Sequence, residues 1–374
     1  MKILIVSDTF YPAPNAAARM LYDMYLYLKV HHEVSVITGG LQNEIVDDIT
    51  YFKLQKSKNN IFRLFNELFF ALKLTFQRKT ENDPDIVIWY SPSIFLSIFV
   101  GICFQNKRRV MILRDLFPLW LEQESTLKPG PARSFLRYIE RYQYKTAHTI
   151  LVQTHGDISL IKNRGAIGDI RVLNNWYSVS KYFGVKPSIA SFNPKTFKII
   201  YAGNAGTAQK LEESITVLSE KLLQQNCAAE LHVFSDKVQN LSDYESGSLR
   251  IKIFEPFDFE STDIIYQKYD FGLVSLNTKL TTNNIPGKYV SYISYGLPVF
   301  VYCSPKIDLF AEVNEYKVGI AFNSEIFDLS LFNYICRNYS TTSANARDLS
   351  LGKYNVDTNL KMLLKVLEKT NENL

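Results

Sequence analysis

The chain has 374 residues, which is long for a single hydrophobic core, so two domains are expected. Hydrophobic residues make up 47% and charged residues 21%, a globular composition that argues against a disordered or fibrous chain. The formal net charge is +5, and the excess is concentrated at residues 51–80, where seven Lys and Arg accompany one acid.

Cysteine and histidine usage argues against a disulfide scaffold or a zinc site. The cysteines form no CxxC pair and the histidines form no HExxH motif, which suits a reducing compartment. The N-terminus, MKILIVSD, runs directly into a strand, so we expect no signal peptide. The residues concerned are Cys103, Cys227, Cys303, Cys336, His31, His32, His148, His155 and His232.

Strands and helices alternate through the first half of the chain, which predicts a parallel, doubly wound α/β sheet. Helices are expected at Ala16–Lys29 and Ala132–Lys145. The apolar run at 94–104 is too short to span a bilayer and predicts a buried helix. The predicted strands are Ile3–Val6, Val34–Thr38, Ile86–Tyr90, Val110–Arg114, Ile150–Gln153 and Arg171–Leu173.

The loop after the first strand, SDTFYPAPNAAARM, leads into a helix. Asn15 is of a residue type that caps helices, and the first amide groups of the helix follow it. We expect Arg19 to reach a phosphate or the acceptor; the alternative is an ordinary helix residue in solvent.

A helix is predicted over residues 61–76, with apolar side chains that share one face (Ile61, Phe65, Leu68, Leu72 and Phe76). Further aromatic and basic residues widen this face, and such a helix suits an anionic membrane surface. The alternative is a helix packed on the sheet with its cations in solvent. No nucleic-acid motif accompanies the cations, so nucleic acid is not expected as a partner. The predicted membrane residues are Arg63, Phe69, Lys73, Arg78 and Lys79.

A charged pair, Arg114 and Asp115, stands at the carboxyl end of a predicted strand, where ligands bind in open α/β sheets. Asp115 can orient an acceptor hydroxyl or accept its proton, or alternatively cap the next turn. The motif Asp83-Pro84-Asp85 looks like a metal-binding DxD. It precedes a strand instead of ending one, so we interpret it as a turn and expect no metal.

The second half repeats the alternation after a mixed segment at 176–197, which is interpreted as an interdomain linker. We therefore predict two Rossmann-like domains, at 1–178 and 179–374, facing a cleft. A last helix at Asp357–Lys369 is in a position to pack back on the N-terminal domain. The predicted strands are Lys198–Tyr201, Leu231–Phe234, Ile251–Phe254, Phe271–Leu276, Val299–Tyr302 and Val318–Phe322.

A Gly-rich turn follows the first strand of this second series, in IIYAGNAGTAQKLEESI. Gly203 and Gly206 allow the backbone to approach a ligand, and the following helix offers amide groups to phosphate. The spacing is not GxGxxG and no acid is placed for an NAD ribose, so a dinucleotide is not expected. The alternative is a tight connection between strand and helix.

The stretch NNIPGKYVSYISYGLPVFVY, residues 283–302, reads as loop, helix, turn and buried strand. Its helix begins at Pro286-Gly287-Lys288, so free amide groups, the positive end of the helix dipole and a lysine converge on one point. This predicts the binding site of a diphosphate-linked donor. The alternative is an ordinary strand–loop–helix connection.

With these motifs on hand, the chain resembles the retaining glycosyltransferases of family 4, over nearly its whole length. The resemblance rests on SDTFYPAPNAAARM, on LRDLFPLWLEQESTLKPG with RYIERYQYKTAHTILVQT, on YAGNAGTAQKLE and on TTNNIPGKYVSYISYGLPV. It is strongest to bacterial enzymes of O-antigen, capsule and colanic-acid-type synthesis, particularly L-fucosamine (2-acetamido-2,6-dideoxygalactose) transferases. The family implies a GT-B fold and metal-independent transfer.

The chain departs from the family at several expected contacts. Ser291 stands where a glutamate holds the donor ribose, and no acid stands near Asn283, where another approaches the sugar. Asn204 and Gln209 occupy the places of an Arg and a Lys that contact the diphosphate. The donor residues that the resemblance implies are Gly203, Asn204, Gly206, Gln209, Lys210, Asn283, Asn284, Pro286, Gly287 and Ser291.

The expected function is transfer of a sugar, such as an N-acetylated 6-deoxyhexosamine, from a UDP-sugar to a lipid-linked (undecaprenyl-diphosphate) acceptor. The expected place is the inner face of the cell membrane, with no cofactor. Lys288 would stabilise the leaving diphosphate, and Asp115 with Arg114 would serve the acceptor. Two alternatives stay open: a non-catalytic partner subunit that has lost its glutamates, and a UDP-sugar 2-epimerase, whose acidic and histidine-rich motif is missing here.

Overall fold

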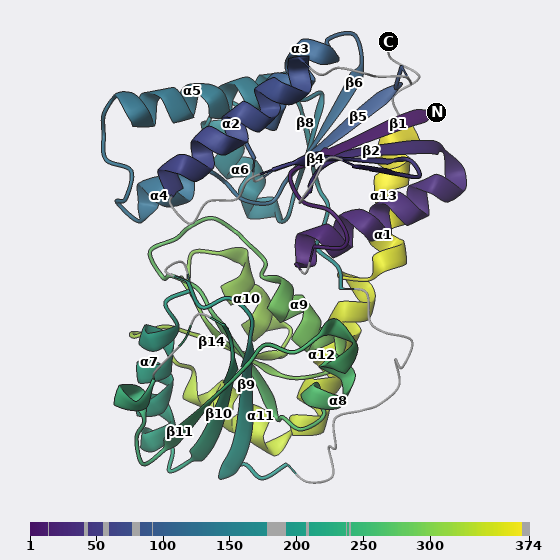
Figure 1. Ribbon diagram of the computed structural model, residues 1–374. Coiled ribbons are helices and arrows are strands. Elements are labelled where there is room, and N and C mark those ends of the chain that lie inside the picture. The colour runs from purple at the N-terminus through teal and green to yellow at the C-terminus, as the bar shows by residue number, and fades with distance from the viewer. Residues whose placement is uncertain are drawn as a thin grey trace. The chain divides into compact units, whose positions relative to one another are not determined.

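A computed structural model describes most of the chain, as two compact units (Figure 1). Unit 1 comprises Met1–Asn174 and Asp357–Leu374, and unit 2 comprises Asn175–Val356. The predicted boundary between 178 and 179 lies outside the described residues. The described ranges are 1–13, 15–40, 44–54, 60–76, 83–91, 93–177, 192–206, 209–236, 238 and 241–368, without the side chains of 60, 61, 63, 242 and 259.

Unit 1 is built on an eight-stranded sheet in the order β3-β4-β2-β1-β5-β6-β7-β8. All neighbouring strands are parallel except β3 and β4, a short antiparallel pair at one edge that the sequence pattern did not predict. The six strands predicted for this half are present. The bounds are β1 (Lys2–Ser7), β2 (Glu33–Gly40), β3 (Glu44–Val46), β4 (Ile49–Lys53), β5 (Ile86–Ser91), β6 (Arg108–Leu113), β7 (Thr149–Val152) and β8 (Asp169–Val172).

Helices cover both faces of this sheet, with α2, α3 and α5 on one face and α1 and α13 on the other (Figure 1). Although α13 ends the chain, it belongs to unit 1. The Arg108 guanidinium donates to the carbonyls of Val366 (2.7 Å) and Leu367, which caps the last turn of α13. The bounds are α1 (Ala16–His31), α2 (Asn60–Phe76), α3 (Leu96–Cys103), α4 (Leu119–Gln123), α5 (Pro131–Thr146), α6 (His155–Asn163) and α13 (Val356–Glu368).

Helix α2 buries one side and exposes another. Phe70, Ala71 and Leu74 are buried against the sheet and its neighbouring helices. Phe65 and Phe76, which were expected on the shared apolar face, are 54% and 85% exposed. Because α2 is apolar around most of its circumference, it packs through Phe70, Ala71 and Leu74 and still exposes these two aromatic rings.

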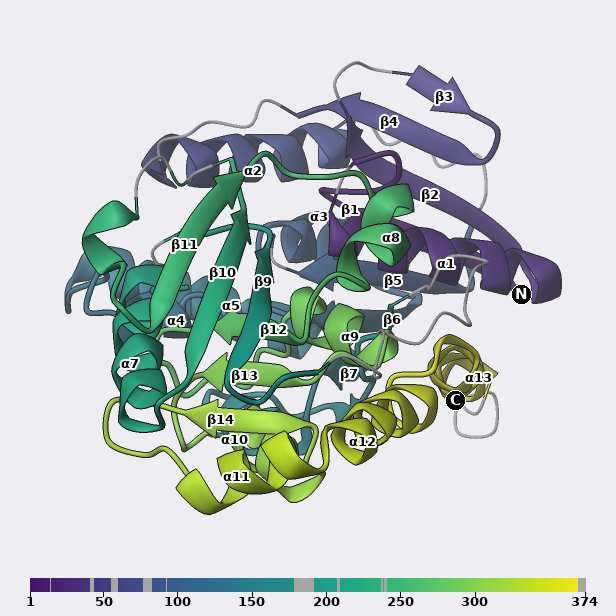
Figure 2. The same cartoon turned by 90° about the horizontal axis from the view of Figure 1, so that it is seen from below.

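Unit 2 contains a six-stranded, fully parallel sheet in the order β11-β10-β9-β12-β13-β14 (Figure 2). Strands and helices have the following bounds: β9 (Thr196–Ala202), β10 (Ala228–Phe234), β11 (Leu249–Phe254), β12 (Phe271–Ser275), β13 (Val299–Tyr302), β14 (Gly319–Phe322), α7 (Leu211–Gln224), α8 (Thr262–Tyr266), α9 (Gly287–Ser294), α10 (Asp308–Glu315), α11 (Leu329–Arg337) and α12 (Tyr339–Gly352). Short 3-10 turns lie at Ser242–Tyr244 and Phe259–Ser261.

Two apolar cores enclose the sheet of unit 2. Alternate strand residues pack against α7 and α11 on one face and against α8, α9, α10 and α12 on the other. The chain winds from β9 outward to β11, then returns to the opposite side of β9 as β12. The strand order therefore reverses between β9 and β12, and such a reversal is where an open α/β sheet binds ligands, outside the carboxyl ends of its strands.

Candidate functional site

The loop that leaves β9 shapes one side of the candidate site. Gly203 has φ +118°, a conformation that favours glycine. Its amide donates to the carbonyl of Phe234 (2.9 Å) and so extends the β9–β10 ladder. The Tyr201 hydroxyl donates to the carbonyl of Asn204 (2.5 Å) and holds the loop from below. The Gly203 amide is therefore already used by the sheet and is not available to a ligand.

The turn into α7 is fixed by the end of β12. The Ser275 hydroxyl donates to the carbonyls of Gln209 and, at 3.2 Å, of Lys210. Lys210 precedes α7 in the left-handed conformation, with φ +48° and an exposed side chain. A Cβ added to Gly206 would lie 3.2 Å from the Gln209 side chain and 3.5 Å from that of Asn204. These two predicted donor side chains therefore converge over Gly206.

The N-terminus of α7 is a poorer anion site than the sequence suggested. Glu212 and Glu213 occupy its first turn, where their charges oppose a phosphate. The Tyr302 hydroxyl also donates to the Glu213 carboxylate (2.6 Å), which holds this acid in place. Positive charge at the carboxyl ends of β9 and β12 therefore has to come from another element.

The basic side chain that reaches these strand ends is that of Lys288, in the first turn of α9. Its Nζ lies 3.5 Å from the centroid of the Tyr201 ring and 3.9 Å from the position of a Cβ added to Gly203. The side chain thus reaches from α9 to the loop after β9. Although the residue as a whole is partly exposed, Nζ is buried and, among the described residues, has no hydrogen-bond partner.

Burial lowers the pKa of Lys288 from 10.5 to about 7. The cause is loss of hydration, because a buried ammonium group without an acceptor is less stable than one in water. A bound anion would reverse this effect by giving the charged form a partner. The amine is therefore an unsatisfied donor at the point where the strand order reverses.

The helix that carries Lys288 is tightly held. The Tyr292 hydroxyl accepts a hydrogen bond from the Ala202 amide (2.9 Å) at the end of β9. Tyr289 donates to the buried carboxylate of Glu312 (2.7 Å) on α10. Pro286 precedes the helix in an extended conformation, and the amides of Gly287 and Lys288 belong to its open first turn. The lysine therefore projects from a rigid support.

Two other predicted donor residues, one in the loop before α9 and one within α9, make contacts inside the unit. The Asn283 side-chain oxygen accepts from the Asp308 amide (2.7 Å) at the start of α10. The Ser291 hydroxyl donates to the Tyr266 hydroxyl (3.2 Å), and both side chains are buried. Asn284 is partly exposed. The structure thus brings Gly203, Asn204 and Lys288 together and turns Asn283 and Ser291 into the protein.

In unit 1, Asn15 caps α1 as predicted. Its side-chain oxygen accepts from the Ala18 amide (2.8 Å), and its amide group donates to the Thr9 hydroxyl (3.1 Å). Arg19 lies in the first turn of α1 and is partly exposed.

The charged pair after β6 is divided. Arg114 is buried, and its guanidinium donates to the Leu173 carbonyl (2.8 Å) and to the Met20 sulfur (3.5 Å). Burial also lowers the pKa of Arg114 to about 10. Asp115 is partly exposed. Arg114 therefore joins the end of β8 to α1, and Asp115 is the more exposed residue of the pair.

Four phenylalanines of α2 are exposed: Phe62 (63%), Phe65 (54%), Phe69 (67%) and Phe76 (85%). Spacings of three, four and seven residues place them along one side of the helix. Lys73, in its last turn, is partly exposed. Arg78 and Lys79 lie outside the described residues. No helix in the described part of the chain is long and apolar enough to cross a bilayer.

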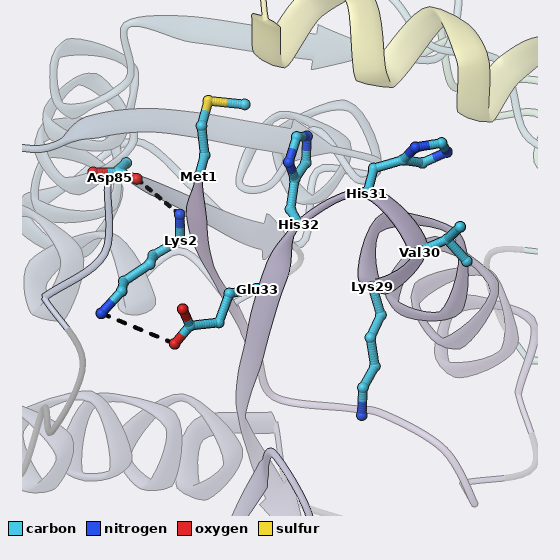
Figure 3. A pocket seen from close by; sticks show the side chains of 8 residues that line it. All are labelled: Met1, Lys2, Lys29, Val30, His31, His32, Glu33 and Asp85. Carbon is cyan, nitrogen blue, oxygen red and sulfur yellow. Dashed lines mark hydrogen bonds and ion pairs between the residues drawn. The ribbon is translucent and has the colours of Figure 1, made fainter.

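Two hollows lie at the opposite, amino-terminal edges of the sheets. The one in unit 1 is lined by residues such as Lys2, Lys29, Glu33 and Asp85 (Figure 3). Its charged groups have partners: the Asp85 carboxylate accepts from the Lys2 backbone amide (2.8 Å), the Lys2 ammonium lies 4.0 Å from Glu33, and Lys29 lies 2.6 Å from Asp48. The hollow in unit 2 lies beside Lys198 and Asp270. Neither contains a predicted site residue.

Sequence reasoning missed Tyr201, Ser275 and Tyr292, which build the site without resembling a motif. The sequence nonetheless contained a signal for each of these residues. Tyr201 stands two residues before Gly203, Ser275 ends a buried strand, and Tyr292 follows Lys288 by one helical turn. Only the alignment of β9, β12 and α9 shows that they meet.

Solved structures share this fold over almost the whole chain. Sucrose-phosphate synthase from Thermosynechococcus elongatus matches with a TM-score of 0.73 at 10% identity, over 99% of this chain and 98% of that chain. HepE from Anabaena, in complex with UDP and glucose, gives 0.62 at 12%, over 99% and 100%. WaaG, a glycosyltransferase involved in lipopolysaccharide biosynthesis, gives 0.61 at 11%, over 98% and 100%. The predicted GT-B fold is confirmed. No protein-family model and no curated protein matches the sequence.

Proposed function

We propose that this chain is a glycosyltransferase that moves a sugar from a UDP-sugar to a lipid-linked, undecaprenyl-diphosphate-type acceptor. The observation that carries the proposal is Lys288, whose buried amine stands without a hydrogen-bond acceptor in the described structure, beside Gly203 at the reversal of the strand order. A diphosphate is an acceptor of the right charge for this position. The fold shared with HepE, solved with UDP and glucose, and with WaaG supports the same assignment.

The chemistry follows from charge. As the bond between sugar and diphosphate stretches, negative charge develops on the diphosphate, and Lys288 and the first amides of α9 stabilise it. In the retaining mechanism that the resemblance implies, the acceptor hydroxyl attacks from the leaving-group face and the departing phosphate takes its proton. Asp115 orients the acceptor. No metal is required, because the lysine and the amide groups supply the positive charge.

The donor sugar is proposed as an N-acetylated 6-deoxyhexosamine such as L-FucNAc, and the product as a bacterial surface polysaccharide such as O-antigen or capsule. The sequence motifs support this choice, and the name of WaaG places a protein of this fold in lipopolysaccharide synthesis.

The nucleotide is tested by thermal unfolding with UDP, GDP, ADP and CMP, each with and without EDTA. A ligand that binds only the folded state raises the unfolding temperature. We expect UDP alone to raise it by about 3 °C at a hundredfold excess over Kd, with no effect of EDTA. A shift with GDP alone would retain the site and change the donor. An unchanged unfolding temperature with all four nucleotides would favour the non-catalytic partner subunit.

We also propose that the exposed phenylalanines and the basic residues of α2 and the segment after it place unit 1 on an anionic membrane surface at the inner face of the cell membrane. Exposed aromatic rings insert at the interface, while Lys and Arg meet anionic headgroups. Lys73 lies on α2 itself, and Arg78 and Lys79 follow it in the sequence. The lipid-linked acceptor would then be available at the surface that the enzyme binds.

Vesicle sedimentation tests this surface. Replacing Phe62 and Phe69 by Ser should weaken binding to anionic vesicles by about tenfold or more, because two rings are lost from the interface. Neither side chain is buried, so the fold should survive. The matched control replaces Val30 and Ile167, which are 78% and 80% exposed elsewhere in unit 1, by Ser. Equal sedimentation of both double variants and the parent would disprove the membrane role of α2.

A further inference from the structure

The contact between Tyr201 and Lys288 fixes the position of the lysine amine in addition to stabilising the fold. The Lys288 Nζ lies 3.5 Å from the ring centroid, near enough for a cation–π interaction of the protonated amine and for an N–H···π contact of the neutral one. Tyr201 itself is fully buried, and its hydroxyl is engaged with the Asn204 carbonyl, so the ring has a fixed position. Lys288 as a residue is partly exposed, so its flexible side chain could also turn toward water.

We propose that Tyr201 is a positioning residue that holds the Lys288 amine against the Gly203 loop before the donor arrives, and that the donor diphosphate binds with uptake of one proton by this amine. The proposal rests on the donor site described above. It goes further by naming the residue that keeps the amine buried away from water and by predicting how the affinity for the donor depends on pH.

The proton uptake follows from the surroundings of Lys288. Without an anion, the pKa of Lys288 is about 7, so the amine is largely neutral above that pH. A diphosphate stabilises the charged form, which raises the pKa in the complex. At a pH between the pKa of the free protein and the pKa of the complex, binding takes up a proton from solvent, and Kd rises about tenfold for each pH unit.

The acidic groups near α9 are hydrogen-bonded to tyrosines. Glu312 of α10 accepts from Tyr289 and Tyr354, Asp263 of α8 accepts from Tyr295, and Glu213 of α7 accepts from Tyr302. Burial raises the pKa of the phenols Tyr201, Tyr266, Tyr289 and Tyr292, so they stay neutral in this range. Glu212 and Lys210 are exposed at the start of α7. Lys288 is thus the group around α9 that we expect to titrate near neutral pH.

The experiment measures the Kd of UDP by calorimetry from pH 7.5 to 9.5, in two buffers that differ in ionisation enthalpy. In this range the terminal phosphate of UDP, with a pKa of about 6, is already ionised. We expect Kd to rise about a hundredfold over these two pH units and about one proton to be taken up. Lys288→Arg is the matched control, because a guanidinium stays charged and its profile should be flat.

Two substitutions test the role of Tyr201. Tyr201→Phe retains the ring and should keep the steep profile. Tyr201→Leu removes the ring, frees the amine to turn to water and should flatten the profile, with weaker binding at pH 7.5. If Tyr201→Leu does not fold, the pH dependence of Kd in the parent and in Lys288→Arg still tests whether a proton is taken up.

The failures can be told apart. A flat profile in the parent chain with intact UDP binding would overturn the proton uptake and leave the donor site standing. A steep profile in Tyr201→Leu would overturn the positioning role of the ring. Absence of UDP binding at every pH would overturn both this inference and the proposed function.

Discussion

Replacing Lys288 by Ala is expected to slow sugar transfer by about a hundredfold or more while the protein stays folded. Loss of one preorganised group that stabilises developing charge costs roughly 2.7–4 kcal/mol of transition-state stabilisation. Here that group is the lysine found between the Gly203 loop and α9 in the described structure, where the loop side chains of Asn204 and Gln209 are uncharged. Lys210, at the start of α7, is exposed, so we do not expect it to take over this role.

The measurement is kcat and KM with a UDP-sugar donor, alongside thermal unfolding of each variant. Lys268→Ala is the matched control, because this exposed lysine lies in the same unit beside the hollow at the opposite edge of the sheet. Removal of the buried amine should not destabilise the fold, since it takes away a group without a hydrogen-bond partner among the described residues. Activity of Lys288→Ala within a few-fold of the parent would show that the lysine is misassigned.

Much of the fold could be predicted from the sequence because parallel strands buried on both faces form apolar runs separated by helices. Val299–Tyr302 was predicted to the residue, and the remaining predicted strands agree within a few residues at their ends. The pair β3 and β4 was missed because both strands are short and the three residues of β3 are exposed, which leaves little hydrophobic pattern.

The site was harder to predict than the fold, since its properties depend on which side chains find partners. Sequence alone suggested Lys288 from its place after Pro286-Gly287, and the structure adds that its amine is buried beside Tyr201. Arg114 looked equivalent, as a cation at the end of a strand. It is instead bonded to Leu173 inside unit 1, a contact across 59 residues that no local pattern reveals.

Gly272→Ala is expected to destabilise unit 2 by about 3 kcal/mol and to weaken UDP binding at the same time. A Cβ at this position of β12 would lie 2.3–2.7 Å from three atoms of the Tyr292 ring, far inside van der Waals contact. The ring is fully buried, and its hydroxyl is bonded to the Ala202 amide, so it has no free direction in which to move. Overpacking of this kind typically costs 1–3 kcal/mol, and a fixed aromatic ring favours the upper end.

The effect on binding follows because Tyr292 belongs to α9. A ring displaced by the new methyl group moves the helix, and Lys288, one turn earlier, moves away from Gly203. Chemical unfolding and UDP titration of the same samples measure both effects. Gly352→Ala is the matched control, because no atom lies within 4 Å of its added Cβ at the end of α12. Tyr292→Leu should cost less stability in the Gly272→Ala background than in the parent, since the smaller side chain relieves the clash. Additive costs in this double-mutant cycle would locate the destabilisation elsewhere and remove the link between β12 and the position of Lys288.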